Sequence, residues 1–160
     1  KLFKTSIFEN VKMGNKNASD EEVMNALRLA RCEDILAKFP EREKTVIGSK
    51  GVHLSGGEIQ RVAIARAILK NADIIILDEA SAAADPENEY EIQQAFSNLM
   101  KNKTVIMIAH RLSSIKNVDE ILVVEDGNIA ERGSDAELMQ KGGKYSRLQG
   151  LYSKANEWRV

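Results

Sequence analysis

The chain has 160 residues, 43% of them hydrophobic, and its 23 basic and 24 acidic side chains leave a formal net charge of -1. This apolar fraction is enough to bury the core of one domain, which argues against a disordered chain. The near balance of charges argues against binding along nucleic-acid backbones, because such binding requires a basic surface.

The cysteine content and the apolar runs indicate the cellular setting. A single cysteine, Cys32, cannot form an intramolecular disulfide, which favours a reducing, cytosolic compartment and a buried apolar role. No apolar run approaches the roughly 18 to 20 residues needed to cross a bilayer, so we expect that the chain itself does not span a membrane. Residues 1–8 contain neither an initiating methionine nor a cleavable leader, so we expect a fragment that begins within a domain.

The first half of the chain has the pattern of a small helical layer. Ser19 is an N-cap candidate before three acidic residues, and apolar side chains then recur at helical spacing. A shorter helix is expected around residues 34–38, an extended stretch at 45–47 and a loop at 48–51. A third helix follows residue 55, and we expect four of its side chains to share an apolar face: Ile59, Val62, Ala63 and Ala67.

From Asp73 the pattern changes to short apolar runs at residues 74–77, 105–109 and 121–124. Such runs are typical of strands that are covered on both faces. A helix with Asp85 as N-cap and Pro86 in its first turn separates the first two runs, so we expect a parallel crossover. The sequence therefore predicts the α/β class, with parallel strands flanked by helices.

The last part of the chain predicts a hairpin followed by two helices. Residues 126–127, Asp-Gly, form a tight-turn signal before an extended stretch at 129–132. Residues 136–158 have helical character with a break near the glycine pair at 142–143.

Two acidic residues, Asp78 and Glu79, follow the first apolar run. Open parallel sheets bind ligands at the carboxyl ends of their strands. In a phosphoryl-transfer site one carboxylate holds magnesium, and a neighbouring carboxylate orients or deprotonates the attacking water. We therefore assign Asp78 to the metal and Glu79 to the water. The alternative is an acidic pair that only ends a strand before a turn.

Ser55, Gly56 and Gly57 precede a long predicted helix. Backbone N–H groups at a helix start face outward, and the helix dipole favours an anion there. Glycines also let the backbone approach a phosphate closely. The alternative is an ordinary serine N-cap followed by two flexible glycines.

His110 ends the second apolar run, where its imidazole is placed to donate a hydrogen bond to a γ-phosphate. A histidine with a purely structural hydrogen bond is the alternative. Asp85 has a structural role as the N-cap before Pro86, so a role toward a nucleotide would be additional to that one.

Four stretches carry the strongest pattern of the chain: Leu-Ser-Gly-Gly-Glu at 54–58, Ile-Ile-Ile-Leu-Asp-Glu at 74–79, Ser-Ala-Ala-Ala-Asp at 81–85, and His110. Together they resemble the ATPase domain of ATP-binding cassette (ABC) transporters. The segments 121–129 and 133–138 are also typical of these domains, and residues 45–51 resemble the exporter-type subset. We refer to residues 54–58 as the signature segment.

The resemblance implies two ATP molecules held with Mg²⁺ between two nucleotide-binding domains in a head-to-tail dimer. The signature segment, from Leu54 to Glu58, would then bind the ATP of the second domain, with Gln60 near its ribose. A polar surface position on the helix is an equally good interpretation of Gln60. Asp85 would also contact a bound nucleotide. Asp78, Glu79 and His110 would serve the ATP of their own domain. The resemblance also implies a transmembrane domain that contacts residues 1–13, and a position on the cytoplasmic side of a membrane.

The resemblance has a gap and two departures. The chain contains no Gly-x-x-x-x-Gly-Lys-Ser/Thr phosphate loop. The nearest match, Gly-Gly-Lys-Tyr at 142–145, lacks the glycine spacing and the hydroxyl. Ala84 stands where the family has leucine, which would weaken the dimer contact, and Glu58 stands where glutamine is more usual.

The resemblance therefore predicts an incomplete P-loop NTPase core with an ABC-type helical subdomain. Within one partial domain over 1–160 we expect a helical subdomain at about 15–70, a parallel-sheet part at about 72–135, and C-terminal helices at 136–160. The first hypothesis is the C-terminal portion of an ABC exporter ATPase that is inactive alone and self-associates. The alternative is a non-enzymatic module that presents the signature segment to a complete domain or docks on a membrane protein. A soluble ABC protein of DNA repair or translation is disfavoured, since long heptads and a basic balance are absent.

Overall fold

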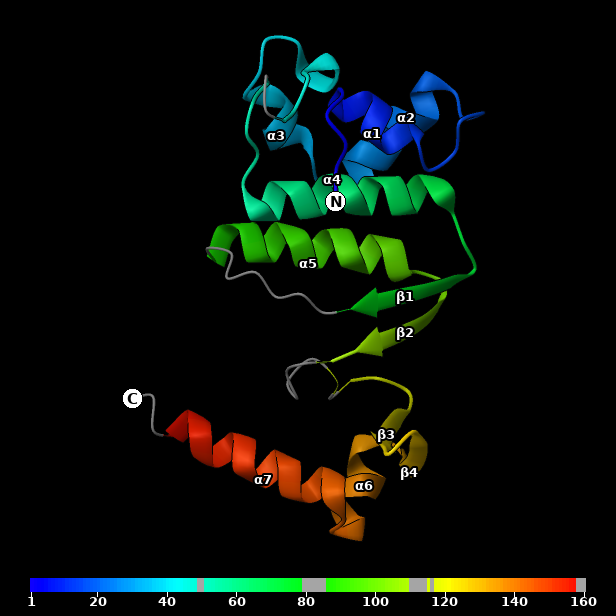
Figure 1. Cartoon of the computed structure of the whole chain (residues 1–160), viewed down its shortest axis with the longest axis vertical. Coiled ribbons are helices and arrows are strands. Elements are labelled where there is room, and N and C mark those ends of the chain that lie inside the picture. The colour runs from blue at the N-terminus through cyan, green and yellow to red at the C-terminus, as the bar shows by residue number, and fades with distance from the viewer. Residues whose placement is uncertain (49–50, 79–85, 110–114, 116, 158–160) are drawn as a thin grey trace. The chain divides into compact units, whose positions relative to one another are not determined.

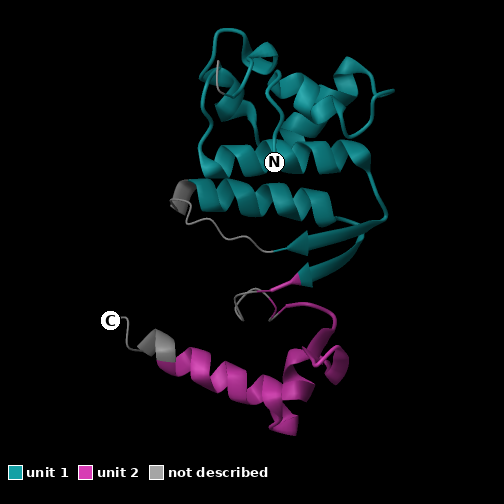
Figure 2. Cartoon of the chain, in the orientation of Figure 1, with its two compact units in different colours: residues 1–107 teal, residues 108–160 magenta. Residues whose placement is uncertain are grey.

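The computed structural model describes residues 1–48, 51–78, 86–109, 115 and 117–157. It divides the chain into two compact units, residues 1–107 and 108–160 (Figure 2). The elements of the first unit are α1 (Ile7–Lys12), α2 (Asp20–Leu29), α3 (Glu33–Ala37), the 3-10 helix η1 (Arg42–Lys44), α4 (Gly56–Lys70), β1 (Ile74–Asp78), α5 (Pro86–Met100) and β2 (Thr104–Ile108). Those of the second unit are β3 (Ile121–Glu125), β4 (Asn128–Gly133), α6 (Asp135–Lys141) and α7 (Lys144–Glu157).

The first unit is layered around the long helix α4. Helices α1, α2 and α3 pack on one side of α4, and α5 lies along its other side, next to β1 and β2 (Figure 1). The predicted N-cap of α2 is confirmed. Ser19 Oγ accepts from the Glu22 N–H at 3.2 Å, and the Glu22 carboxylate accepts from the Ser19 N–H at 2.6 Å. This reciprocal capping box fixes where the helix begins.

The predicted apolar face of α4 is wrong in part. Ile59 is 39% exposed, whereas Val62, Ile64 and Ala65 are buried together with Arg61. The reason is that α4 is covered from two sides, by α1 and α2 and by α5. A helix that is covered on two sides does not need a single apolar stripe.

The strands β1 and β2 form a parallel pair, as the crossover predicts (Figure 1). The prediction that both faces of these strands are covered is wrong for the described chain. Ile75 and Leu77 pack against the core, but Ile74 and Ile76 on the opposite face are 60% and 68% exposed, and Ile106 of β2 is 53% exposed. The sheet is therefore apolar on both faces and covered on one.

A buried asparagine and an arginine join α1 to α4. Asn10 is fully buried, and Arg66 of α4 donates to its backbone oxygen at 2.7 Å and to its Oδ1 at 2.8 Å. The Asn10 amide in turn donates to the Phe3 oxygen at 3.0 Å. These bonds hold the N-terminal segment and α1 against the second half of α4.

The second unit contains the predicted hairpin and the predicted pair of helices. β3 and β4 are antiparallel, and both turn residues are left-handed, with φ of 48° at Asp126 and 76° at Gly127. This conformation suits the Asp-Gly pair in a two-residue hairpin turn. The Glu131 carboxylate accepts the N–H groups of Lys144 and Tyr145 at 2.7 and 3.0 Å, so a strand residue caps the start of α7. Those two hydrogen bonds lower the pKa of Glu131.

Among the described residues, no helix combines the length and the apolar character that crossing a bilayer requires.

Candidate functional site

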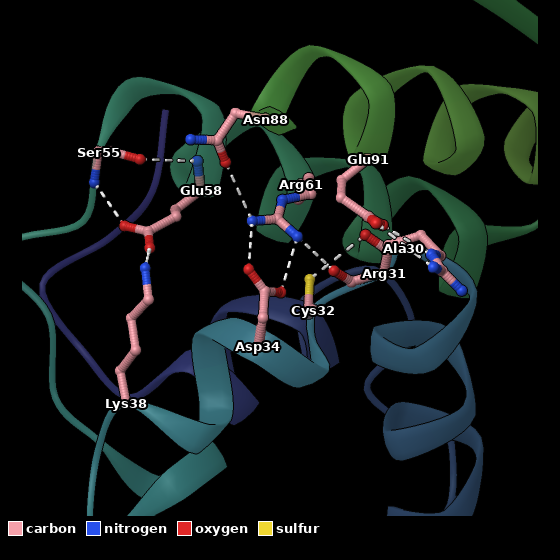
Figure 3. Close-up of polar contacts among 10 residues, drawn as sticks. All are labelled: Ala30, Arg31, Cys32, Asp34, Lys38, Ser55, Glu58, Arg61, Asn88 and Glu91. Atoms are coloured by element: carbon pink, nitrogen blue, oxygen red, sulfur yellow. Dashed lines mark hydrogen bonds and ion pairs between the residues drawn. The ribbon is translucent and has the colours of Figure 1, made fainter. Parts of the chain in front are cut away.

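The signature segment forms the N-terminal end of α4 (Figure 3). Ser55 is the N-cap. Its Oγ accepts from the Glu58 N–H at 3.3 Å, and the Glu58 carboxylate accepts from the Ser55 N–H at 2.7 Å. Serine followed three residues later by glutamate is the pattern of a capping box, so the sequence itself dictates where this 15-residue helix begins.

The capping box leaves two backbone donors open, in the sense that no described residue accepts a hydrogen bond from them, at the exposed Gly56 and the buried Gly57. The first N–H groups of a helix have no partner within the helix. The Glu58 N–H bonds to Ser55 Oγ and the Ile59 N–H to the Ser55 oxygen, whereas those of Gly56 and Gly57 bond to no described residue. Ser55 and Gly56 are exposed, and the dipole of α4 adds a partial positive charge at this end. The helix start therefore fits an anion such as a phosphate.

Glu58 places a carboxylate in the first turn, close to this anion-binding end. Its side chain is turned into the protein, where Lys38 of the α3 C-cap donates to Oε1 at 2.5 Å. Burial alone would raise the pKa of Glu58, but the hydrogen bonds from Lys38 and the Ser55 N–H outweigh it and the pKa lies below its usual value. The negative charge is thus matched by Lys38 and does not oppose an anion at Gly56.

Gly57 lies where α4 meets the start of α5. A Cβ at this position would lie 3.3 Å from Ile92 Cδ1 and 3.4 Å from the Cβ of Asn88. Even a methyl group here would require the Ile92 and Asn88 side chains to shift by a few tenths of an ångström. The second glycine of the signature segment therefore has a packing role besides its open N–H group.

Arg61, one turn further along α4 from Gly57, connects several elements. It is 1% exposed and donates to both carboxylate oxygens of Asp34 at 2.7 and 2.8 Å, to the Arg31 oxygen at 2.5 Å and to Asn88 Oδ1 at 3.2 Å. Burial alone would raise the pKa of Asp34, but the Arg61 hydrogen bonds and charge outweigh it and hold the pKa low. Arg61 thereby ties α4 to α3, to the end of α2 and to α5.

Sequence reasoning missed Arg61 and its partners. A signal for Arg61 existed: the buried positions Gly57, Arg61, Ile64 and Ala65 of α4 follow helical spacing, which places the arginine in the middle of a buried face. No local pattern identifies Asp34 or Asn88, since each lies 27 residues from Arg61 in the sequence.

The other predicted site residues have the following places. Leu54 packs against the apolar core, Gln60 lies half-buried in the first turns of α4, and Asp78 is exposed at the carboxyl end of β1. Glu79, Asp85 and His110 lie outside the described residues. The structure therefore brings Leu54 to Glu58 and Gln60 together at one helix end, and their contacts with a nucleotide and that of Asp78 with magnesium stay predictions.

Comparison with known proteins identifies the family. A family model described as "ABC transporter" matches residues 2–82 of the 160. The chain belongs to the ABC transporter family. The resemblance drawn from the signature segment and from residues 74–85 is thereby confirmed.

The relatives and a solved structure are of the exporter type or of ABC subfamily B. The chain is 50% identical over 147 residues to "ABC transporter B family member 4" of Dictyostelium discoideum, covering 92% of this chain and 19% of that protein. It is 47% identical over 150 residues to an ATP-dependent lipid A-core flippase of Chromobacterium violaceum, covering 94% and 26%. A bacterial Atm1-family ABC exporter solved with ATP bound matches with a TM-score of 0.81 and 40% identity, over 94% of this chain and 26% of that one.

These matches confirm the α/β fold of an ABC transporter ATPase domain. The chain spans about a quarter or less of the length of these relatives. ATP and Mg²⁺ are the ligands that the family implies, and the open N–H groups of Gly56 and Gly57 fit the phosphate part of that pair.

Proposed function

We propose that this chain provides the signature segment and the strand-end residues of the ATP-hydrolysing domain of an ABC exporter. The observation that carries the proposal is the pair of open N–H groups at Gly56 and Gly57, at the start of a long helix. It is supported by identities of 40% to an ABC exporter and 50% to an ABC transporter B family member, each over more than nine-tenths of this chain. Coupling of ATP hydrolysis to transport is part of this proposal.

In this proposal the signature segment acts on the ATP of a second nucleotide-binding domain, in a head-to-tail dimer. Ser55, Gly56 and Gly57 hold its phosphates, and Gln60 lies near its ribose. Leu54 and Glu58 keep the helix start in place, Leu54 through its core contacts and Glu58 through its bonds to Ser55 and Lys38.

The remaining residues act on the ATP of their own domain. Asp78 holds Mg²⁺ at the end of β1, Glu79 orients or deprotonates the attacking water and His110 contacts the γ-phosphate. Asp85 adds a contact to a nucleotide bound in the dimer. Residues 15–70, 72–135 and 136–160 form the helical subdomain, the sheet part and the C-terminal helices, and residues 1–13 face a transmembrane domain on the cytoplasmic side of the membrane.

The first test measures ATP binding by the chain alone and the effect of the chain on a second domain that contains a phosphate loop. We expect the purified chain with Glu79→Gln to show no calorimetric signal with Mg-ATP, because the phosphate-loop motif is absent from its 160 residues. Added to an ABC ATPase domain that does contain the loop, the wild-type chain is expected to change the ATPase rate of that domain. Ser55→Arg is expected to abolish the change, since the long cation blocks the start of α4.

Ser19→Arg is the matched control, because Ser19 caps α2 with the same reciprocal bonds to a glutamate three residues later. It removes an equivalent cap without touching the signature segment. Stoichiometric Mg-ATP binding by the chain alone, or equal effects of Ser19→Arg and Ser55→Arg, would contradict the proposed division of roles.

The open face of the β1–β2 sheet leads to a second expectation. Ile74, Ile76 and Ile106 expose more than half of their surface there. In the chain alone, such a face is expected to pair with another copy, so light scattering should detect dimers or larger species. Ile76→Lys is expected to shift the population toward monomer.

Leu151→Lys in α7 is the matched control, since Leu151 is 65% exposed and Ile76 is 68% exposed. It places the same charge on an equally exposed apolar position of the second unit. A monodisperse wild-type monomer would overturn the expectation of self-association, and an equal effect of both lysines would assign it to apolar exposure in general.

A further inference from the structure

In the first turn of α5, Asn88 contacts the first two turns of α4. Its Oδ1 accepts a hydrogen bond from the Arg61 Nη2 at 3.2 Å (Figure 3). Its Cβ lies 3.4 Å from the place where a Gly57 side chain would begin. Asn88 therefore contacts α4 both through a polar bond and through close packing at the signature segment.

The other partners of Arg61 make it a fixed anchor for Asn88. Asp34 binds both ends of the guanidinium at 2.7 and 2.8 Å, and the Arg31 oxygen accepts a third bond at 2.5 Å. These contacts come from α3 and from the end of α2. These contacts do not involve Asn88, so loss of the Asn88 side chain removes one polar link between α5 and α4, while Arg61 stays attached to the helical layer and Ile92 keeps its packing at Gly57.

The position of Asn88 in the chain connects two sets of proposed site residues. It lies in the first turn of α5, which begins at Pro86 directly after residues 79–85. That stretch contains Glu79 and Asp85, whereas the α4 turn that Asn88 contacts carries Gly56 and Gly57. The Asn88 contact thus joins the end of the stretch 79–85 to the helix end that offers its N–H groups to an anion.

We propose that Asn88 is a positioning residue: it fixes the start of α4, with the N–H groups of Gly56 and Gly57, against the start of α5. The functional part of this inference rests on the function proposed above. Asn88 itself contacts neither phosphate nor metal in this role, and it acts through Arg61 and through its packing at Gly57.

Hydrogen exchange of the 160-residue chain tests the contact itself. In Asn88→Ala we expect the hydrogen-bonded amides of residues 58–61 to exchange about tenfold faster, the effect of losing a hydrogen bond to a charged group. Asn88→Asp is expected to restore slow exchange, because its carboxylate accepts from the same guanidinium. Glu91→Gln is the matched control, since Glu91 of α5 binds the Arg31 side chain at 2.7 Å and acts on Arg61 through its charge alone.

The ATPase mixture described above tests the functional part. In this mixture the chain changes the kcat of the domain that contains the phosphate loop, and Asn88→Ala is expected to reduce that change at least fivefold. The KM for ATP is set by the phosphate loop of the other domain and should stay constant. Asn88→Asp should restore kcat. If the wild-type chain does not change the ATPase rate of the other domain, the proposed function is refuted, and with it the functional role of Asn88. The hydrogen-exchange experiment still decides whether Asn88 holds the start of α4. Three results would overturn the inference: unchanged exchange at residues 58–61 in Asn88→Ala, equal acceleration by Glu91→Gln, or a wild-type chain without protection at these amides.

Discussion

Replacing Arg61 with alanine is expected to lower the free energy of unfolding by about 2 to 4 kcal/mol, from the cavity and the unsatisfied acceptors that the truncation leaves. The cost is below that of breaking a fully buried ion pair, because the Asp34 side chain is 52% exposed. The side chain is 1% exposed, and its guanidinium satisfies Asp34, the Arg31 oxygen and Asn88 together. Alanine leaves a cavity and removes the donor from all three acceptors. Urea unfolding followed by circular dichroism measures the change.

Arg132→Ala is the control for this measurement. Arg132 also forms a short ion pair, with Glu120 at 2.6 Å, but both side chains are largely exposed, at 66% and 44%. Exposed pairs contribute little, so no measurable change is expected. Equal effects of the two alanine variants would show that the Arg61 network does not hold the first unit together.

Acid provides a further check on the Arg61 network. Since the folded-state pKa of Asp34 lies below its usual value, its charged form stabilises the fold above the unfolded-state pKa of about 3.9. That contribution is lost as the pH falls through the lower, folded-state pKa. The difference in the free energy of unfolding between wild type and Arg61→Ala should therefore become smaller below about pH 4. A difference that is constant from pH 7 to pH 3 would assign the effect to packing alone.

The features that sequence reasoning predicted correctly depend on local chemistry. The cap of α2 at Ser19 and the turn at Asp126–Gly127 are each specified by residues within a few positions of one another. Such bonds and dihedral preferences form wherever these residues occur, so the sequence alone is enough to find them.

The features that it missed depend on neighbours distant in the sequence. The buried face of α4 is set by two different helix layers, and the open face of β1 depends on what covers Ile74 and Ile76. The role of Arg61 requires Asp34 and Asn88, which only the fold brings together. For the site, the sequence located the signature segment, and the structure added the bond from Lys38 to Glu58 that keeps this helix end suited to an anion.

Gly14→Ala is expected to destabilise the chain by about 2 to 3 kcal/mol, at the upper end of the usual cost of overpacking. Gly14 follows α1 and faces the second half of α4. An added Cβ would lie 2.3 Å from the Arg66 backbone oxygen and 3.2 Å from the Lys70 nitrogen. Both atoms belong to the backbone of α4, so no rotation of a side chain relieves the clash, and α1 must move away from α4.

The same substitution at Gly150 is expected to have the opposite effect on stability. Gly150 lies inside α7, and a Cβ there would have no neighbour within 4 Å. Alanine in an exposed helix interior is more favourable than glycine by about 0.5 to 1 kcal/mol, so Gly150→Ala should raise the stability of α7. Thermal unfolding of the two variants separates the effects, because the gain in helix propensity is expected only at Gly150, inside α7, and the backbone clash only at Gly14, in the turn after α1. Wild-type stability of Gly14→Ala would contradict the close approach of α1 to α4. It would equally contradict the Arg66–Asn10 hydrogen bonds of 2.7 and 2.8 Å, which depend on that approach.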